Sequence, residues 1–467
     1  MSTFSGLGTA ASALAAARRG IDLVGQNVAN QTTQGYTRQR LETSSVVPPA
    51  VSGRFSTGVQ PGQGVSIDGI SRLGDAVLDA RVRDTLASSG YWSTKAIAAL
   101  TAEAALAEPT ENGIADRLSQ FWAGWQDLSN SPDSTAAAAV VLTGAEALAA
   151  RIADGYRAVA GQWSSARGSV DGMVAQINAT AGEVAQLNAS IRDAAASGGS
   201  LNELVDRRNL LAQTVSRLSG AVGTVEADGT MTLRLDGNAL VSGDKARVLT
   251  VDGPSSIEAG RPTVLSWEGS FAVNIASGEL GGMLAVLAPA DQGGVLAGLA
   301  ASHNDLATSL ATALNAQHRA GATSGGAPGG DFFALSAGGP AALGLTVVPQ
   351  GRTDLALAAP GGGALDGTNA DAMWAISRRP DGPDALWGDV VSRFAVATAA
   401  DAGRAERAET GAVAAAVAQQ SVAGVDNDEE TLNLLTYQTA YQAAARVLTA
   451  VDEALDVLIN RTGLVGR

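Results

Sequence analysis

The chain has 467 residues, a formal net charge of −15 and no cysteine; 46% of its residues are hydrophobic and 4% are aromatic. The acidic balance disfavours contact with phosphate backbones, so we expect no nucleic-acid partner. The absence of cysteine excludes disulfides, thiolate metal sites and cysteine nucleophiles. Because Ala, Leu and Val carry the apolar content, long helices are favoured, and the length allows roughly two to four domains.

The first segment predicts an amphipathic helix. Its apolar residues recur at alternating spacings of three and four, which is the two-position seam of a heptad repeat. Its two arginines follow the apolar run instead of preceding it, so the segment does not read as a cleaved signal peptide, and no stretch predicts insertion into a membrane. The predicted seam includes Leu7, Leu14, Ile21 and Val28.

The helix pattern ends in the stretch ANQTTQGYTRQR, residues 29–40. Gly35 is expected to turn the chain with a positive φ, and Tyr36 to bury its ring while its hydroxyl finds a partner. Arg38 is expected to make a forked contact with a carboxylate. These contacts could lie within one chain, but seams at both chain ends favour their use between chains.

The middle of the chain alternates between helical and extended patterns. A stretch rich in Gly, Pro and β-branched residues predicts extended chain at 41–71. Alternating residues around two Asp-Gly pairs predict a β-rich insertion at 221–278. Ser131 is expected to cap one helix, with Pro132 at its first position. Helices are predicted at 73–106, 113–130, 131–152, 170–196, 279–319 and 384–423, with some β character at 343–358.

Candidate catalytic and ligand-binding residues are few. His303 and His318 are too far apart in sequence for a compact local ligand pair, and we expect them on a helix surface or at a helix end. The Asn-x-Ser/Thr matches at Asn178 and Asn188 are expected to be ordinary polar residues of a helix. The glycine-rich stretch at 321–333 lacks the Gly-Lys-Ser/Thr of a phosphate loop. We therefore expect no enzyme, metal or cofactor, although carboxylate pairs distant in sequence leave a secreted cell-wall hydrolase open.

The last segment predicts a second long helix with a matching seam. Asp426 or Asn427 can cap its start, and Glu429 or Glu430 can close a capping box. A calcium loop is disfavoured because the central glycine is missing. Since an isolated helix is marginal in water, the two ends are expected to pair with each other or with neighbouring chains. The seam includes Leu434, Tyr441, Leu448 and Leu455.

Both ends of the chain together resemble the bacterial flagellar rod, hook and hook-associated proteins. The N-terminal signature comprises Asn27, Asn30, Thr33, Gly35, Tyr36, Arg38 and Gln39. The C-terminal signature comprises Tyr441, Gln442, Ala443, Ala444 and Arg446. The continuation TRQR after Gly-Tyr is most similar to the hook-associated members, and internal segments such as LNAQHRAGATSGGAPGGDFF agree. The chain departs from the usual pattern at Thr32-Thr33-Gln34 and at Asp426-Asn427.

The resemblance implies a mainly α-helical fold with a β-rich insertion. It implies a terminal coiled-coil domain from both chain ends (1–40 and 428–467), a helical-bundle domain from both halves (41–220 and 279–427) and an outer β-rich domain (221–278). The implied role is structural, at the junction that joins hook to filament outside the cell, after export from the cytoplasm by the flagellar type III apparatus. A hook or distal-rod protein is the alternative, which the GYTRQR stretch disfavours.

The resemblance also implies the partners. These are further copies of the chain in a ring, formed through the terminal helices, together with the hook protein and the second hook–filament junction protein. A cytoplasmic export chaperone is expected at the C-terminal segment. Neither nucleic acid nor a membrane is an expected partner.

Overall fold

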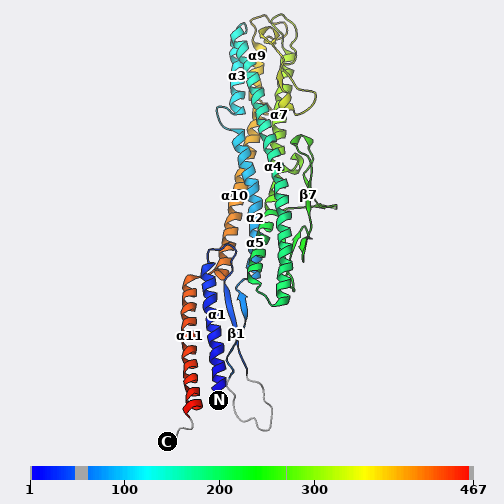
Figure 1. The fold of residues 1–467 in the computed structure, drawn as a ribbon. Helices are drawn as coiled ribbons and strands as arrows, with labels where there is room; N and C mark the ends of the chain where they lie inside the picture. Colours follow the sequence, from blue (N-terminus) through cyan, green and yellow to red (C-terminus); the bar gives the residue numbers. More distant parts are fainter. Residues whose placement is uncertain (1–2, 48–61, 270, 462–467) are drawn as a thin grey trace.

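The computed structural model describes residues 3–47, 62–269 and 271–461. The molecule is elongated, with a pair of helices from the two chain ends at one extremity and a long helical body continuing from it (Figure 1). A group of small antiparallel sheets lies along one side of this body. The predicted fold class, mainly helical with some sheet, is thus confirmed in these broad terms.

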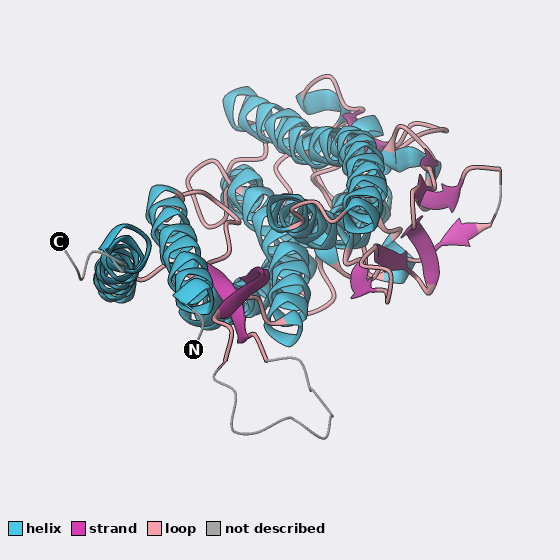
Figure 2. Cartoon of the chain, turned by 60° about the horizontal axis from the view of Figure 1, so that its bottom comes forward, coloured by secondary structure: helices cyan, strands magenta, loops and turns pink. Residues whose placement is uncertain are grey.

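The extremity consists of two helices and a hairpin, which we call the terminal unit. Helix α1 (Thr3–Ala29) packs against helix α11 (Asn427–Asp456). The two run antiparallel, because Gly6 lies against Val451 and Gly20 lies against Tyr437. Strands β1 (Gln39–Ser45) and β2 (Val65–Arg72) form an antiparallel hairpin beside α1 (Figure 2). These strands agree with the extended chain predicted at 41–71, of which 48–61 lies outside the described residues.

The helical body is built from segments on both sides of the sheets in sequence. Its aromatic core includes Phe121, Trp125 and Phe332, which pack against one another and are almost completely buried. Helix α10 runs beside α2, so the C-terminal half of the chain returns along the N-terminal half. The principal helices are α2 (Ala76–Leu106), α3 (Ile114–Asn130), α4 (Thr135–Ser197), α5 (Asn202–Ser219), α6 (Gly278–Leu287), α7 (Val295–Ala320) and α10 (Pro383–Ala423), with the shorter α8 (Ala341–Gly344) and α9 (Thr368–Trp374).

Helix α4 corrects the sequence prediction. The two helices expected at 131–152 and 170–196 form one helix of 63 residues. It continues between them because Tyr156 and Trp163 are buried there in the body and no proline interrupts the chain. The cap is also different: Ser134 caps α4 by accepting a hydrogen bond from the backbone N–H of Ala137 (3.1 Å), while Ser131 ends α3.

The helix expected at 279–319 is instead two helices, α6 and α7. Pro289 follows the end of α6, and a proline ring cannot continue a helix without losing a backbone hydrogen bond. Gly293 then turns the chain with a φ of +82° before α7 begins.

Helix α4 contains a window that is long and apolar enough to cross a bilayer by length and composition alone. However, α4 packs against α3, α5 and α7, and its buried residues include Val141, Ile152 and Ile177. Part of its apolar character is therefore explained by packing in the body.

Seven short strands form two antiparallel sheets, which we call the β unit. The first sheet has the order β3 (Val222–Val225), β4 (Met231–Leu235), β5 (Asn238–Ser242), β6 (Lys245–Ala246). The second has the order β7 (Leu249–Asp252), β8 (Val264–Trp267), β9 (Ala272–Val273). A further pair, β10 (Phe333–Ala334) and β11 (Thr346–Val347), lies apart from them. The β character expected at 343–358 thus comprises one very short strand and an isolated bridge between Ala358 and Ala322.

Two asparagines of α4 attach the β unit to the body. The side chain of Asn188, which is completely buried, accepts a hydrogen bond from the N–H of Met231 and donates to the carbonyls of Met231 and Gly243. Asn178 makes the equivalent pair with the N–H and carbonyl of Leu249. Both are polar residues of a helix, as expected, and their amides have the further role of satisfying backbone groups of the sheets.

His318 lies in the last turn of α7, at a helix end as expected, whereas His303 lies in the middle of the helix, and both side chains are completely buried. His318 donates its Nδ1–H to the carbonyl of Gly330 (2.8 Å), and its Nε2 accepts from the N–H of Ala356 (3.0 Å). His303 donates Nδ1–H to the carbonyl of Leu299 and lies edge-on to Trp387. Burial lowers the pKa of both rings below its ordinary value of 6.5, so both are neutral core side chains at pH 7.

Candidate functional site: the turn after the first helix

Asn27, near the end of α1, is the centre of the turn that the sequence singles out. Its side chain is 2% exposed and makes four hydrogen bonds. The amide oxygen accepts from the hydroxyl of Tyr36 (2.8 Å) and from the N–H of Gln39 (3.1 Å). The amide nitrogen donates to the carbonyl of Gln39 (3.0 Å) and to the carboxylate of Glu430 (3.2 Å). One asparagine therefore holds α1, β1 and the start of α11 together.

Arg38 ties the turn to α11 by a two-carboxylate contact. Its Nε donates to Glu430 (2.7 Å), which is 1% exposed, and its Nη1 pairs with Glu429. Burial by itself lowers the pKa of Arg38, but the two carboxylates outweigh burial and raise it. The predicted cap at Asp426 is confirmed, since its carboxylate accepts from the N–H groups of Asp428 and Glu429. The two glutamates contact Arg38, and neither closes a capping box.

The middle of the turn is compact. Gly35 has a φ of +79°, which glycine adopts without strain, and it lies against Leu210 of α5. Asn30 donates to the carbonyl of Gln26 and accepts from the hydroxyl of Thr33. Burial, with the negative charges of Asp206, Glu203 and Glu430, raises the pKa of Tyr36 to about 12. The Tyr36 hydroxyl thus remains a donor to Asn27 throughout the physiological pH range.

Asp206 of α5 joins the turn to the helical body. One carboxylate oxygen accepts from the backbone N–H of Thr37 (3.0 Å), and the other pairs with Arg72 at the end of β2. The N–H of Arg38 donates to the carbonyl of Ala423, the last residue of α10. Sequence reasoning missed Asp206 and Arg72 because no local pattern marks a carboxylate that lies 169 residues from its backbone partner.

These contacts all lie within one chain. The sequence favoured an intermolecular role for the turn residues, whereas the structure shows that the same side chains have partners inside the molecule. Arg38, Tyr36 and Asn27 together fix how α1, α11 and the body meet. The turn therefore fixes the orientation of the terminal unit relative to the helical body.

The members of the predicted seams are mostly half-buried. Two members are exposed: Val28 is 46% exposed and Tyr441 is 37% exposed. Asn27 is buried in place of Val28, and Tyr437 packs on Gly20. In a straight helix, residues spaced by heptads rotate around the helix axis by about 20° per heptad. A stripe of such residues therefore turns away from the neighbouring helix after a few turns. The half-buried members are Leu7, Leu14, Ile21, Leu434, Leu448 and Leu455.

The C-terminal signature presents only one of its residues to α1. Ala444 is 7% exposed, whereas Gln442, Ala443 and Arg446 are exposed to solvent. These exposed residues belong to a large part of the α11 surface that no other segment covers in the described part of the chain. Leu432 and Leu435 on the same helix are 65% and 62% exposed.

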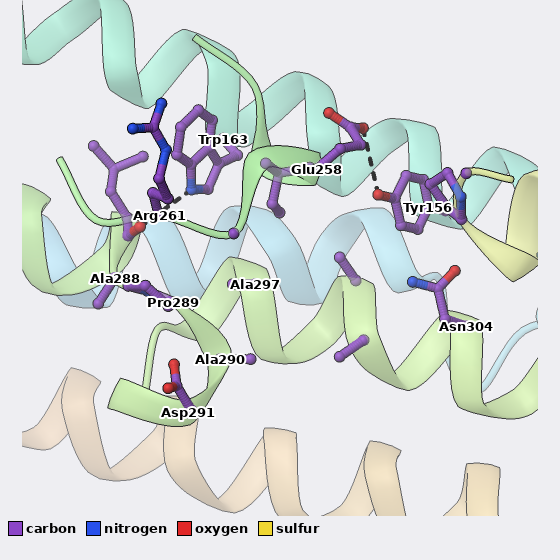
Figure 3. Close-up of a pocket in the computed structure, with 17 residues that line it drawn as sticks. Tyr156, Trp163, Glu258, Arg261, Ala288, Pro289, Ala290, Asp291, Ala297 and Asn304 are labelled. Atoms are coloured by element: carbon purple, nitrogen blue, oxygen red, sulfur yellow. Dashed lines mark hydrogen bonds between the residues drawn. The ribbon is translucent and has the colours of Figure 1, made fainter. Parts of the chain in front are cut away.

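A cavity of about 600 Å³ lies between the β unit and helices α4 and α7 (Figure 3). Its walls carry polar groups that the chain itself engages: the hydroxyl of Tyr156 donates to Glu258 (3.3 Å), and the indole N–H of Trp163 donates to the carbonyl of Leu287 (3.3 Å). Both rings are almost completely buried. The cavity therefore lies at the boundary between the β unit and the body, and the polar groups of the two aromatic residues that line it are already engaged within the chain.

Comparison with known proteins gives two family matches. Residues 100–333, half of the chain, match the model of the flagellar hook-associated protein FlgK helical domain. Residues 419–461 match the model of the flagellar basal body rod FlgEFG protein C-terminal region. The second match covers all of α11, the helix that pairs with α1.

Similar proteins carry corresponding names. The flagellar hook-associated protein 1 of Bacillus subtilis is 29% identical over the whole of both chains. The proteins of that name from Salmonella typhimurium and Escherichia coli are each 28% identical, over 70% and 76% of this chain and 58% and 63% of their own lengths. The flagellar hook junction protein FlgK from Burkholderia pseudomallei superposes with a TM-score of 0.46 at 25% identity, over 55% of this chain and 47% of that protein.

Proposed function

The chain belongs to the FlgK family of flagellar hook-associated proteins, and we propose that it is a subunit of the junction between the hook and the filament, incorporated through its terminal unit. The family is a structural component of the external flagellum and is not an enzyme family. The observation that carries the proposed mode of incorporation is the pairing of α1 with α11 outside the helical body, with much of the α11 surface uncovered in the described residues.

The geometry supports a different role for each of three parts of the molecule. The terminal unit, formed by α1, β1, β2 and α11, is the part that contacts other subunits. The helical body is a rigid spacer, because its core is continuous from α3 to α5 and into the β unit. The β unit is an outer domain attached along α4 through Asn178 and Asn188.

The proposed partners are those of an axial subunit. Further copies of the chain form a ring, the hook protein lies on one side of the ring and the second hook–filament junction protein lies on the other. Before export by the type III apparatus, the exposed face of α11 is a suitable site for a chaperone, since exposed leucines on a monomeric chain favour a protective partner.

A hook or distal-rod protein is the competing assignment within the axial class. The match at 419–461 to a rod-protein C-terminal model shows that this helix is shared across the class. The match at 100–333 is to the FlgK helical domain in particular, and it favours the junction over the hook or rod.

Deletion and complementation test this function. A strain lacking the gene is expected to build hooks, to shed flagellin into the medium and to carry no attached filaments. The full chain should restore attachment, as counted by electron microscopy. Attached filaments in the deletion strain would contradict the proposal.

A further inference from the structure

A second cavity lies beside the turn after α1, and we propose that it binds an organic cation with a short apolar body. The cation is an amidinium, guanidinium or ammonium group, carried either by a free molecule or by a side chain of another protein. The cavity is separate from the contact that pairs α1 with α11, and its chemistry does not depend on the junction function.

The walls of this cavity come from two parts of the molecule. Its volume is about 400 Å³, within the range of roughly 300–1,000 Å³ that is usual for small-molecule pockets. One wall is the turn at 26–36, and the other is the segment 203–211 of α5. The half-buried side chains of Tyr36, Leu210 and Leu211 make the surface mostly apolar. An apolar body the size of one aromatic ring therefore has partners on both sides.

Two carboxylates give the cavity its preference for positive charge. Asp206 is buried in the wall and pairs with Arg72, which lies outside the lining. Glu203 is exposed at the rim, where its carboxylate accepts from the hydroxyl of Ser200 (3.0 Å) and has no ion-pair partner among the described residues. Burial, and then the charges of Asp206 and Glu203, raise the pKa of Tyr36, so both carboxylates act on a ring that lines the cavity. A bound cation would supply the partner that Glu203 lacks.

The arginine in the lining does not cancel this preference. Arg207 has a side chain that is 69% exposed, and its Nη2 lies 3.8 Å from the carboxylate of Glu183, which is not part of the wall. An anion in the cavity would meet the carboxylates of Glu203 and Asp206, whereas a cation would be attracted to both. The ligand class is therefore a cation and not an anion or a neutral molecule.

A bound cation would also join the turn to the helical body. One wall belongs to the turn and the other to α5, so a ligand that contacts both stabilises their present arrangement by mass action. We therefore expect hydrogen exchange in residues 30–37 to slow when the cavity is filled.

Titration of the purified full chain with benzamidine, benzamide and benzoate tests the charge preference. The probes have nearly the same shape, and at neutral pH they are a cation, a neutral molecule and an anion. Saturation-transfer NMR should show benzamidine binding about tenfold more tightly than benzamide, and benzoate not binding. Added salt should weaken the binding of benzamidine alone. Equal affinity for benzamidine and benzamide, or no saturable binding of benzamidine, would overturn the proposal.

Two variants with matched controls place the bound probe. Glu203→Gln should weaken benzamidine binding by about fivefold, which is the most that an exposed ion pair usually contributes. Gln34→Trp should block the cavity mouth. The controls are Glu146→Gln, at an exposed glutamate of α4, and Gln31→Trp, at an exposed position of the same turn, both outside the wall. Unchanged binding in either Glu203→Gln or Gln34→Trp, with unaltered circular dichroism, would overturn the proposal.

Photolabelling with para-azidobenzamidine distinguishes the two sources of the cation. In the purified chain, mass spectrometry should find the label in peptides that contain 26–36 or 203–211. The same label on isolated hook–filament structures indicates a free ligand, whereas protection there indicates that a side chain of another subunit fills the cavity. Label confined to other peptides of the purified chain would overturn the proposal. Absence of the chain from the isolated structures would instead contradict the junction function and leave the binding result standing.

Discussion

Replacing Glu430 by alanine is expected to separate the start of α11 from the turn after α1. The Glu430 carboxylate is 1% exposed and accepts hydrogen bonds from both Arg38 and Asn27. The substitution leaves the buried amide of Asn27 without this acceptor and Arg38 paired with Glu429 alone, and a lost hydrogen bond to a charged group costs about 1.5–3 kcal/mol. Hydrogen exchange should therefore accelerate in residues 27–45 and in the first turns of α11, while the helical body retains its protection.

The adjacent glutamate supplies the control. Glu429 pairs with the same arginine, but its side chain is 60% exposed, and exposed ion pairs contribute roughly 0–1 kcal/mol. Glu429→Ala should leave exchange in both segments nearly unchanged. Equal and small effects of the two substitutions would show that the buried carboxylate does not hold the terminal unit to the turn.

Acidification from pH 7.5 to pH 5.5 is expected to destabilise the helical body through its two buried histidines. Burial lowers the pKa of His303 and His318 in the folded chain, whereas in the unfolded chain both titrate near 6.5. Below that pH the unfolded chain binds protons that the folded chain does not, so stability falls as pH falls, and the loss levels off below the folded pKa. Each histidine contributes at most about 1.4 kcal/mol per pH unit.

Urea unfolding at the two pH values measures this loss. The structure also gives the physical reason at His318: a proton on its Nε2 would face the N–H of Ala356 and break that hydrogen bond. His318→Gln cannot take up the proton, so its free energy of unfolding should depend less steeply on pH even if it is lower overall. The same pH dependence in the variant and the unchanged chain would exclude His318 as a source of the loss.

Local patterns in the sequence predicted the features that neighbouring residues determine. The terminal helices were visible from their apolar spacing, the cap at Asp426 from its residue type, and the hairpins of the β unit from Asp228-Gly229 and Asp236-Gly237. The cap predicted at Ser131 is instead at Ser134, and the two serines are chemically equivalent as caps. Which of them starts α4 depends on where α3 ends.

Contacts between distant segments could not be predicted in this way. Asn27 and Glu430 are 403 positions apart, and a glutamate in the first turn of a helix is equally suited to a capping role. In the sequence, Asn188 is indistinguishable from other polar residues of a helix. Its partner Met231 lies on a strand that is adjacent to it only in the folded chain. Both cases involve a polar side chain whose partner is known only after the fold is known.

The most direct test of the junction function is the position of the protein on isolated flagella, measured by immunogold labelling. We predict label in a single band at the outer end of the hook, where the filament begins. Label along the whole length of the hook, or only at its base, would contradict the assignment to the hook–filament junction.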